Sequence, residues 1–305
     1  MTTTLVSSAL PATGLRKSFG DNVVLDGIDL DIAEGTVFSL LGPNGAGKTT
    51  AIQIFSTLLH PDGGKVHIGG FDLSRQPDKV RSVIGVTGQF SAVDNLLTGT
   101  ENLMLMADLH HIARRSARGR VGELLDRFDL ADAAGRIAVT YSGGMRRRLD
   151  LAMTLIGDPR LIFLDEPTAG LDPEERVRFH NLLGSIGEDV VVILSTHIVS
   201  DVTDLCREMA ILHKGKVRMT GDPVRAVDAL EGRIWRKTIE KAELSVHESR
   251  FQVVSTRLYG GRTRLHVFAN DRPDGTFERV TPDLEDVYFT VIKGFATADA
   301  SRSVA

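Results

Sequence analysis

A glycine-rich loop supplies the clearest chemistry in the chain. The run Gly42 to Thr49 fits the phosphate-binding pattern G-x-x-x-x-G-K-[ST] at every fixed position. Its glycines let successive backbone N–H groups face one anion, Lys48 can reach the β- and γ-phosphates, and the Thr49 hydroxyl is a hard oxygen ligand suited to Mg²⁺. The loop predicts a nucleoside triphosphate site made of Gly42, Pro43, Asn44, Gly45, Ala46, Gly47, Lys48, Thr49 and Thr50.

The flanks of this loop are those that phosphate binding requires. Residues 37–41 form an apolar run that reads as a buried strand, and residues 51–59 place apolar side chains at helical spacing. A helix that starts near Lys48 would add its unpaired N–H groups and the positive end of its dipole. The alternative is a glycine turn that only joins strand to helix. This alternative is disfavoured, because the sequence matches every fixed position of the phosphate-binding pattern.

Three further strands are expected to end in polar side chains at the same edge of a sheet. The strand at 161–164 ends in Asp165 and Glu166, which suits Asp165 as a metal ligand and Glu166 as a general base. His197 follows the strand at 190–195, which we expect to be the last core strand. Gln89 follows the short strand at 83–86, although that signal is weak by itself.

Other polar positions have two interpretations each. Ser142-Gly143-Gly144 precedes an amphipathic helix and could form a second anion-binding nest, or only a helix cap with a tight turn. Phe19 could stack on a base or could serve as a plain core or lid residue. His110 and His111 are adjacent on a helix, so they do not face one ligand, and no metal site is expected there.

Composition bounds the class of protein. The 305 residues are 42% apolar and 25% charged, as in an ordinary soluble globular chain. The net charge of -4 gives no electrostatic case for nucleic acid. One cysteine, Cys206, rules out an internal disulfide, and no apolar run approaches the length of a membrane span. Any work at a membrane is therefore expected to go through a partner.

The remaining elements frame the site. We expect a loose start up to about residue 11, an antiparallel strand with one wet face at 23–32, and two helices between 98 and 130 that form an inserted subdomain. A hairpin at 208–219 would close this domain. Beyond residue 225 the pattern predicts a small α+β appendage, with Trp235 packed inside it.

In this order the motifs resemble those of the ATP-binding subunit of an ATP-binding-cassette (ABC) transporter, from about residue 15 to residue 222. The resemblance implies an α/β fold: a P-loop ATPase core, an antiparallel β subdomain, an inserted helical subdomain and a C-terminal α+β appendage. The division implied is a flexible N-terminus (1–11), an ABC nucleotide-binding domain (12–224) with a helical subdomain at about 90–158, the appendage (225–294) and a disordered tail (295–305).

The resemblance also implies roles. Phe19 would stack on adenine, Gln89 would contact Mg²⁺ and sense the membrane partner, and His197 would hold the γ-phosphate. Thr49, Gln89 and Asp165 would serve the metal. Two copies would pair head to tail, with Ser142, Gly143 and Gly144 of one closing the ATP site of the other, and Asp172 would touch the other subunit. The expected location is peripheral, at the cytoplasmic face of the cell membrane on a separate multi-span permease.

The signature loop departs from the family's common Leu-Ser-Gly-Gly-Gln, because Tyr141 and Met145 stand at its ends. The run 141–151, with Thr87-Gly88-Gln89 and residues 96–99, resembles the daunorubicin-resistance type of drug exporter. Residues 284–289 are similar to the tail of such subunits. The expected cargo is a drug, an antibiotic or a lipid-like small molecule.

Three alternatives stay open. The first is a soluble cassette ATPase that acts in translation or DNA repair. Translation-type members resemble two cassettes in one chain, whereas this sequence has one glycine loop. Repair-type members carry a long coiled coil, and the sequence has no such heptad run. An importer subunit would use the same ATP site. A regulatory ATP sensor with vestigial hydrolysis is disfavoured by Glu166 and His197.

Overall fold

The structure is a computed structural model and describes residues 8–88 and 92–295. The described residues form a central sheet from β3 (Val37–Leu41), β6 (Ile84–Thr87), β7 (Leu161–Asp165), β8 (Val191–Thr196), β9 (Glu208–His213) and β10 (Lys216–Gly221). Their spatial order is β10-β9-β3-β8-β7-β6, and all neighbours are parallel except β9 and β10. Every residue of β3, β7 and β8 is buried, which explains their continuous apolar runs.

Alternate side chains of these strands face two different cores. One set, including Phe38 and Phe163, packs against α1 (Lys48–Phe55) and the antiparallel sheet. The other set, including Val37 and Leu164, packs against helices on the opposite face. Those helices are α3 (Gly99–Leu109), α4 (Arg114–Arg127), α5 (Gly143–Leu155) and α6 (Pro173–Ile186). The glycine-loop strand β3 is therefore clamped from both sides.

The antiparallel sheet has the order β2-β1-β4-β5, from β1 (Ser8–Phe19), β2 (Asn22–Ala33), β4 (Gly63–Ile68) and β5 (Phe71–Asp72). In β2, Ile28, Leu30 and Ile32 are buried and alternate with less buried residues, as predicted. The loose start predicted for residues 1–11 is wrong for residues 8–11, because β1 begins at Ser8 and Leu10 is fully buried in the first core. Residues 1–7 lie outside the described residues.

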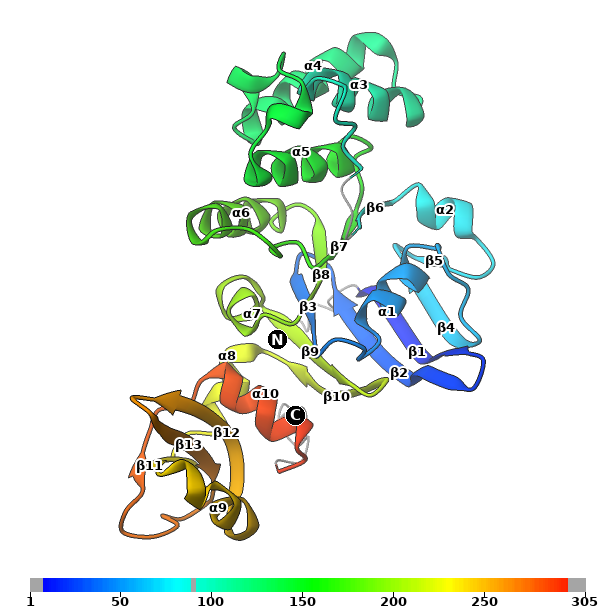
Figure 1. The fold of residues 1–305 in the computed structure, drawn as a ribbon. Coiled ribbons are helices and arrows are strands. Elements are labelled where there is room, and N and C mark those ends of the chain that lie inside the picture. Colours follow the sequence, from blue (N-terminus) through cyan, green and yellow to red (C-terminus); the bar gives the residue numbers. More distant parts are fainter. Residues whose placement is uncertain (1–7, 89–91, 296–305) are drawn as a thin grey trace, which may run out of the picture.

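The helices α3, α4 and α5 form the layer farthest from the antiparallel sheet (Figure 1). Thr98 begins α3 with a capping box: its hydroxyl accepts from the N–H of Glu101, whose carboxylate accepts from the N–H of Thr98. The inserted helices between strands β6 and β7 were expected from the sequence. Short elements complete this half of the chain: α2 (Pro77–Arg81), η1 (Ala131–Ala133) and η2 (Ala138–Thr140).

The prediction that β8 is the last core strand is wrong. β9 follows it and inserts beside β3 in parallel, so only β10 has the antiparallel, hairpin relation expected for residues 208–219. Four consecutive residues of β9, from Met209 to Leu212, are fully buried. Pairing with the far-removed β3, rather than the local turn to β10, gives this strand its place in the core.

The C-terminal part is an α+β unit, as predicted. Its sheet has the order β12-β13-β11-β14, from β11 (Ile234–Ile239), β12 (Gln252–Tyr259), β13 (Arg262–Phe268) and β14 (Glu278–Arg279). Trp235 is buried in a small core of this sheet. The helices of this unit are η3 (Lys241–Glu243), α9 (Leu244–Arg250) and α10 (Leu284–Ile292). Two other helices lie outside it: α7 (Val199–Leu205) connects β8 to β9, and α8 (Pro223–Asp228) follows β10.

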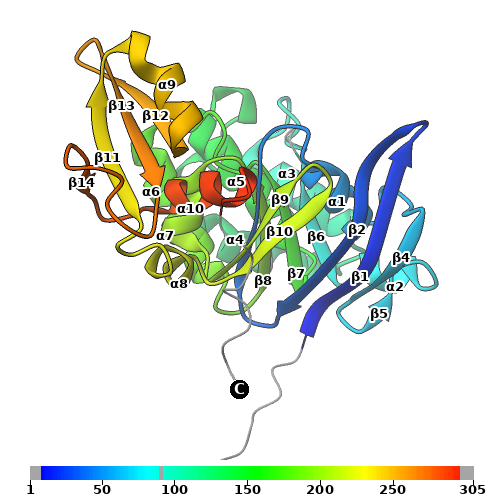
Figure 2. The same ribbon diagram turned by 90° about the horizontal axis from the view of Figure 1, so that it is seen from below.

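Helix α10 joins this unit to the ATPase sheet. Leu284 and Val287 share one core with Leu41 of β3 and Ile211 of β9. Figure 2 shows α10 beside β9 and β10, with the antiparallel sheet at the opposite end of the molecule. Of the predicted tail 295–305, the described residue Phe295 packs against this same core, and 296–305 lie outside the described residues.

Candidate functional site

The glycine loop follows β3 directly and is held tightly by its neighbours. The N–H of Gly42 donates to the carbonyl of Thr196 at 3.2 Å, which fixes the loop to the end of β8. A Cβ at Gly42 would lie 2.3 Å from the carbonyl oxygen of Leu212, so only glycine fits. Gly47 has φ 106°, and a Cβ there would lie 2.6 Å from Leu25. The loop geometry therefore depends on these two glycines.

Lys48 begins α1 and points back along the loop. Its side chain is 5% exposed, and Nζ donates to the carbonyls of Gly42 at 2.8 Å and Pro43 at 3.1 Å. The Glu166 carboxylate lies 3.8 Å from Nζ. Burial lowers the pKa of the Lys48 ammonium, and the carboxylates of Glu166 and Asp165 oppose that shift. The loop thus holds a cation with donor capacity for further oxygen ligands.

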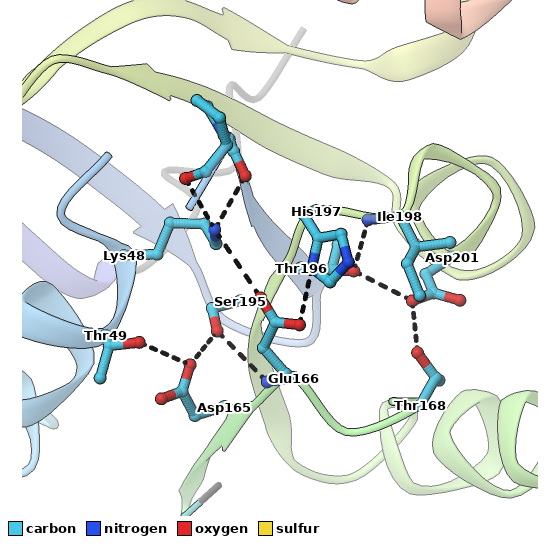
Figure 3. A network of polar contacts seen from close by, with 12 residues as sticks. Lys48, Thr49, Asp165, Glu166, Thr168, Ser195, Thr196, His197, Ile198 and Asp201 are labelled. Atoms are coloured by element: carbon cyan, nitrogen blue, oxygen red, sulfur yellow. Dashed lines mark hydrogen bonds and ion pairs between the residues drawn. The ribbon is translucent and has the colours of Figure 1, made fainter. Parts of the chain in front are cut away.

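Thr49 and Asp165 meet beside this lysine (Figure 3). The Thr49 hydroxyl lies 3.2 Å from Oδ1 of Asp165, and the Ser195 hydroxyl donates to the same carboxylate oxygen. Asp165 ends β7 and Ser195 lies on the adjacent β8, so neighbouring parallel strands deliver both groups to one edge. Hydroxyl and carboxylate oxygens are the ligands that Mg²⁺ prefers, so this donor set fits that ion.

Glu166, which lies 3.8 Å from Lys48, also pairs with His197. Nδ1 of His197 lies 2.7 Å from Oε2 of Glu166. The Glu166 backbone has φ 52°, a left-handed conformation that costs about 1–3 kcal/mol in a residue with a side chain and is concentrated at functional sites. Its N–H donates to the carbonyl of Ser195 at 3.1 Å and lies 3.3 Å from the hydroxyl, which holds the turn in place.

These groups surround a cavity of about 530 Å³. Its walls come from the glycine loop, the start of α1, the start of β2 and the residues that follow β7 and β8. The lining residues are Asn22, Val24, Asn44, Gly45, Gly47, Lys48, Thr49, Thr50, Glu166 and His197. The structure thus brings the predicted phosphate-loop residues together with the predicted base and histidine. Over residues 8–88 and 92–295, no cluster of three or more His, Cys, Asp or Glu side chains is placed to hold a metal ion.

Other predicted site residues lie away from this lining. Ser142 caps α5 by accepting from the N–H of Met145 at 3.1 Å, and Ser142 and Gly143 are exposed while Gly144 is packed against Glu175. Asp172 caps α6 by accepting from the N–H of Glu175 at 2.9 Å. The Ser142 cap agrees with the helix-cap interpretation of that segment, and both Ser142 and Asp172 remain exposed to solvent.

Phe19 ends β1 with half of its surface exposed, and Nζ of Lys17 lies 5.5 Å from its ring centre. The turn that follows Phe19 leads to Asn22, which lines the cavity. Gln89, expected at the metal, lies outside the described residues. The nearby chain is anchored at Ala92, whose N–H donates to the Asp150 carboxylate at 3.1 Å.

The structure adds residues that the sequence did not single out. Ser195 touches both Asp165 and the Glu166 N–H, and its only sequence signal is its place two residues before His197. Arg147 donates to the carbonyl of Pro167 at 2.8 Å, directly after Glu166. Burial lowers the pKa of Arg147, against the opposing charges of Asp150 and Asp165. Asp201 lies fully buried behind His197 and had no local signal.

Sequence comparison places these residues among known proteins. The ABC transporter family model matches residues 25–169. The daunorubicin resistance ATP-binding protein DrrA3 of Streptomyces coeruleorubidus is 45% identical over 218 residues, which cover 71% of this chain and 69% of that protein. The daunorubicin/doxorubicin resistance ATP-binding protein DrrA of Streptomyces peucetius is 37% identical over 273 residues, or 89% and 81% of the two chains.

Comparison with solved structures supports the same fold. An ATP-binding subunit of an ABC transporter matches with TM-score 0.64 and 27% identity, over 72% of this chain and 92% of that one. A second ATP-binding cassette, in its ADP conformation, matches with TM-score 0.64 at 23% identity. Within the described ranges, none of the helices combines the length and apolar character needed to cross a bilayer.

Proposed function

This chain belongs to the family of ABC transporter ATP-binding proteins, and from that premise we propose that it hydrolyses ATP to power export of a small molecule through a separate membrane permease. The observation that carries the proposal is the contact of Glu166 with His197 beside Lys48 in the glycine-loop cavity. A phosphate loop alone supports nucleotide binding. A carboxylate and an imidazole at its open side add the groups that hydrolysis needs.

The loop binds and orients the nucleotide. Backbone N–H groups from residues 44–49 and the start of α1 face the β- and γ-phosphates, and Lys48 neutralises their charge. The residues that fit Mg²⁺ are Thr49 and Asp165, with Gln89 as a further expected ligand. Bound there, the ion would neutralise charge on the phosphate oxygens. Phe19 is proposed to stack on adenine, near Asn22 at the start of β2.

Glu166 is the proposed general base. Its carboxylate is proposed to take the proton of the attacking water. His197 contacts this carboxylate and is proposed to hold the γ-phosphate. The Glu166 turn is pinned to Ser195 on the next strand, so the base has little freedom to move away. Preorganised charge of this kind is the main source of rate in phosphoryl transfer.

The second anion nest serves a second copy of the chain. Ser142 and Gly143 are exposed, away from the lining of their own cavity, and Asp172 is exposed at the start of α6. We propose a head-to-tail dimer in which Ser142, Gly143 and Gly144 of one chain close over the ATP of the other. In this arrangement each site uses the loop of one copy and the nest of its partner.

The permease is proposed to dock on an exposed apolar patch that follows Gln89 in the chain. The patch consists of Leu96, Ile137 and Val139, which are 84%, 46% and 58% exposed. Backbone bonds from Ala138 to Leu97 and from Val139 to Asn95 hold the two segments side by side. Exposed apolar clusters of this kind mark protein contacts. Docking there would place the chain peripherally at the cytoplasmic face of the membrane, with no nucleic acid involved.

One experiment tests the export proposal. The tagged chain is purified from gently solubilised native membranes, and the bound proteins are identified by mass spectrometry. We expect one stoichiometric multi-span membrane protein; Leu96→Arg should lose it, and Leu258→Arg, which alters a 78% exposed leucine on the appendage, should retain it. Recovery of ribosomal or DNA-repair proteins instead would contradict the transporter role while leaving the ATPase site intact.

The captured pair then distinguishes export from import. Reconstituted into vesicles with the ATPase outside, an exporter should accumulate its cargo inside when ATP is added. Daunorubicin is the first probe, because it appears in the names of the two Streptomyces relatives described above. Release of preloaded cargo from the same vesicles on adding ATP would support the importer alternative.

A further inference from the structure

Asp201 is the most enclosed carboxylate near the site, and it lies on α7, just after His197 in the chain. The Asp201 side chain is fully buried, and three neighbouring side chains form hydrogen bonds with its carboxylate. The hydroxyls of Thr168 and Thr196 donate to Oδ2 at 2.5 Å and 3.0 Å, and Nε2 of His180 lies 3.1 Å from Oδ1. Burial raises the pKa of Asp201, but the bonds from His180, Thr168 and Thr196 outweigh it and leave the pKa below its usual value. The group is therefore an anion that accepts from all three.

The two threonines belong to the backbone segments that carry the reacting groups. Thr168 lies two residues after Glu166, and Thr196 lies directly before His197. The Thr196 hydroxyl also accepts from the N–H of Ile198 at 2.9 Å, so the bonds enclose the backbone on both sides of His197. Figure 3 shows Asp201 on the far side of this turn from Glu166, with Thr168 below it.

We propose that Asp201 is a positioning residue for ATP hydrolysis, whose carboxylate ties the turn after Glu166 to the turn that carries His197. One oxygen, Oδ2, receives both threonine hydroxyls, so any widening between the two turns must break a short buried bond. The inference rests on the roles proposed for Glu166 and His197. It adds a buried side-chain link to a pair that is also joined by its own 2.7 Å contact and by the bonds of the Glu166 N–H to Ser195.

The two carboxylates that flank His180 have different surroundings. Asp204, also on α7, faces Nδ1 of His180 at 3.6 Å, but its side chain is 57% exposed. Asp201 contacts the segments of Glu166 and His197 and is buried. Asp204→Ala is therefore the matched control: it removes an acidic side chain from the same helix and the same histidine without touching either threonine.

The test compares turnover with nucleotide affinity in the full chain. Asp201→Ala should lower kcat ~10–100-fold, the effect of a misplaced catalytic group, while the Kd for a fluorescent ATP analogue changes less than about twofold. Asp201→Asn places an uncharged amide at this position. The hydroxyls of Thr168 and Thr196 can rotate to accept hydrogen bonds from its NH₂ group, so this variant should keep most of the wild-type kcat. Asp204→Ala should leave kcat and Kd unchanged. A residue that served only to stabilise the fold would lower turnover and affinity together.

Thr168→Val covers the case in which Asp201→Ala does not fold. It removes one hydroxyl, keeps the side-chain shape and leaves the His180 and Thr196 bonds in place. We expect reduced kcat at unchanged Kd; wild-type kcat in Thr168→Val or in folded Asp201→Ala would overturn the inference. Glu166→Gln is measured beside them. If Glu166→Gln is inactive while Asp201→Ala is fully active, the positioning role of Asp201 is wrong and the role of Glu166 stands. Wild-type turnover in Glu166→Gln would overturn both the proposed general base and this inference.

Discussion

Replacing Lys48 with alanine tests the phosphate site most directly. The ammonium has three donors, of which two bond to the carbonyls of Gly42 and Pro43. Nucleotide binding redirects its charge toward the β- and γ-phosphates. Each charge-assisted hydrogen bond contributes ~1.5–3 kcal/mol, so two of them amount to ~3–6 kcal/mol. At 1.4 kcal/mol for each factor of ten, kcat/KM should fall ~10²- to 10⁴-fold.

The stability of the nucleotide-free protein should change much less. Burial lowers the pKa of Lys48 in the folded state, so the folded protein is less favourable to the charged form than the unfolded chain is. The charging cost is fully present below the folded pKa and is relieved as the pH rises from the folded pKa to the unfolded pKa. Alanine removes that cost at neutral pH but leaves the Gly42 and Pro43 carbonyls without this donor. The two effects oppose each other.

The assay measures steady-state ATP turnover, together with the melting temperature with and without ATP. A ligand at 100 times its Kd stabilises the folded state by about 2.7 kcal/mol, so the wild-type protein should show a clear upward shift. Lys48→Ala should lose this shift along with turnover. Lys65→Ala, at an exposed position on β4, should keep both. Wild-type turnover or a wild-type ATP-induced shift in Lys48→Ala would refute the assignment of the phosphate site.

Three further predictions use other positions. Gly47→Ala should weaken ATP binding and lower the free energy of unfolding by ~1–3 kcal/mol, because φ is 106° and the new Cβ would lie 2.6 Å from Leu25. Calorimetry measures this loss, with Gly119→Ala as the control, because a Cβ at Gly119 meets open space. Glu166→Gln should trap a symmetric dimer in saturating ATP, and a monomer in light scattering would contradict the shared site. Glu208→Gln should raise the melting temperature at neutral pH, because burial and the charges of Asp31 and Asp222 raise the Glu208 pKa and so disfavour its ionised form in the folded protein. That gain should vanish as the pH falls through this raised pKa and protonates the wild-type carboxyl; a gain that persists at about pH 3.5, below the usual glutamate range, would contradict it.

Local patterns predicted the parts of the fold that local interactions determine. The fixed glycines, the apolar run of β3 and the helical spacing of α1 lie within twenty residues, so the strand, loop and helix around Lys48 were predictable. Asp165, Glu166 and His197 could be placed at one sheet edge, because parallel strands bring their carboxyl ends together. The α/β class followed from the same runs.

Features that depend on distant pairing were missed. Residues 8–11 contain Pro11 and lack alternation, yet β1 extends through them because β2 and the first core supply its partners. The parallel partner of β9 is β3, more than one hundred and fifty residues earlier, and only its antiparallel partner β10 is local. The bonds from Thr168 to Asp201 and from Ser195 to Asp165 likewise join positions about thirty residues apart. No spacing rule in one sequence marks such pairs.

The core shared by Leu41, Ile211 and Val287 has a consequence for synthesis on the ribosome. Chains emerge from the N-terminus, so β3 and β9 leave the exit tunnel well before α10 exists to cover them. During that interval the apolar side of β9 faces water or a chaperone. Nascent chains arrested with β9 outside the tunnel but before α10 has emerged should therefore stay bound to holdase chaperones, and release should coincide with the emergence of α10. The ATPase fold is completed by its last described helix.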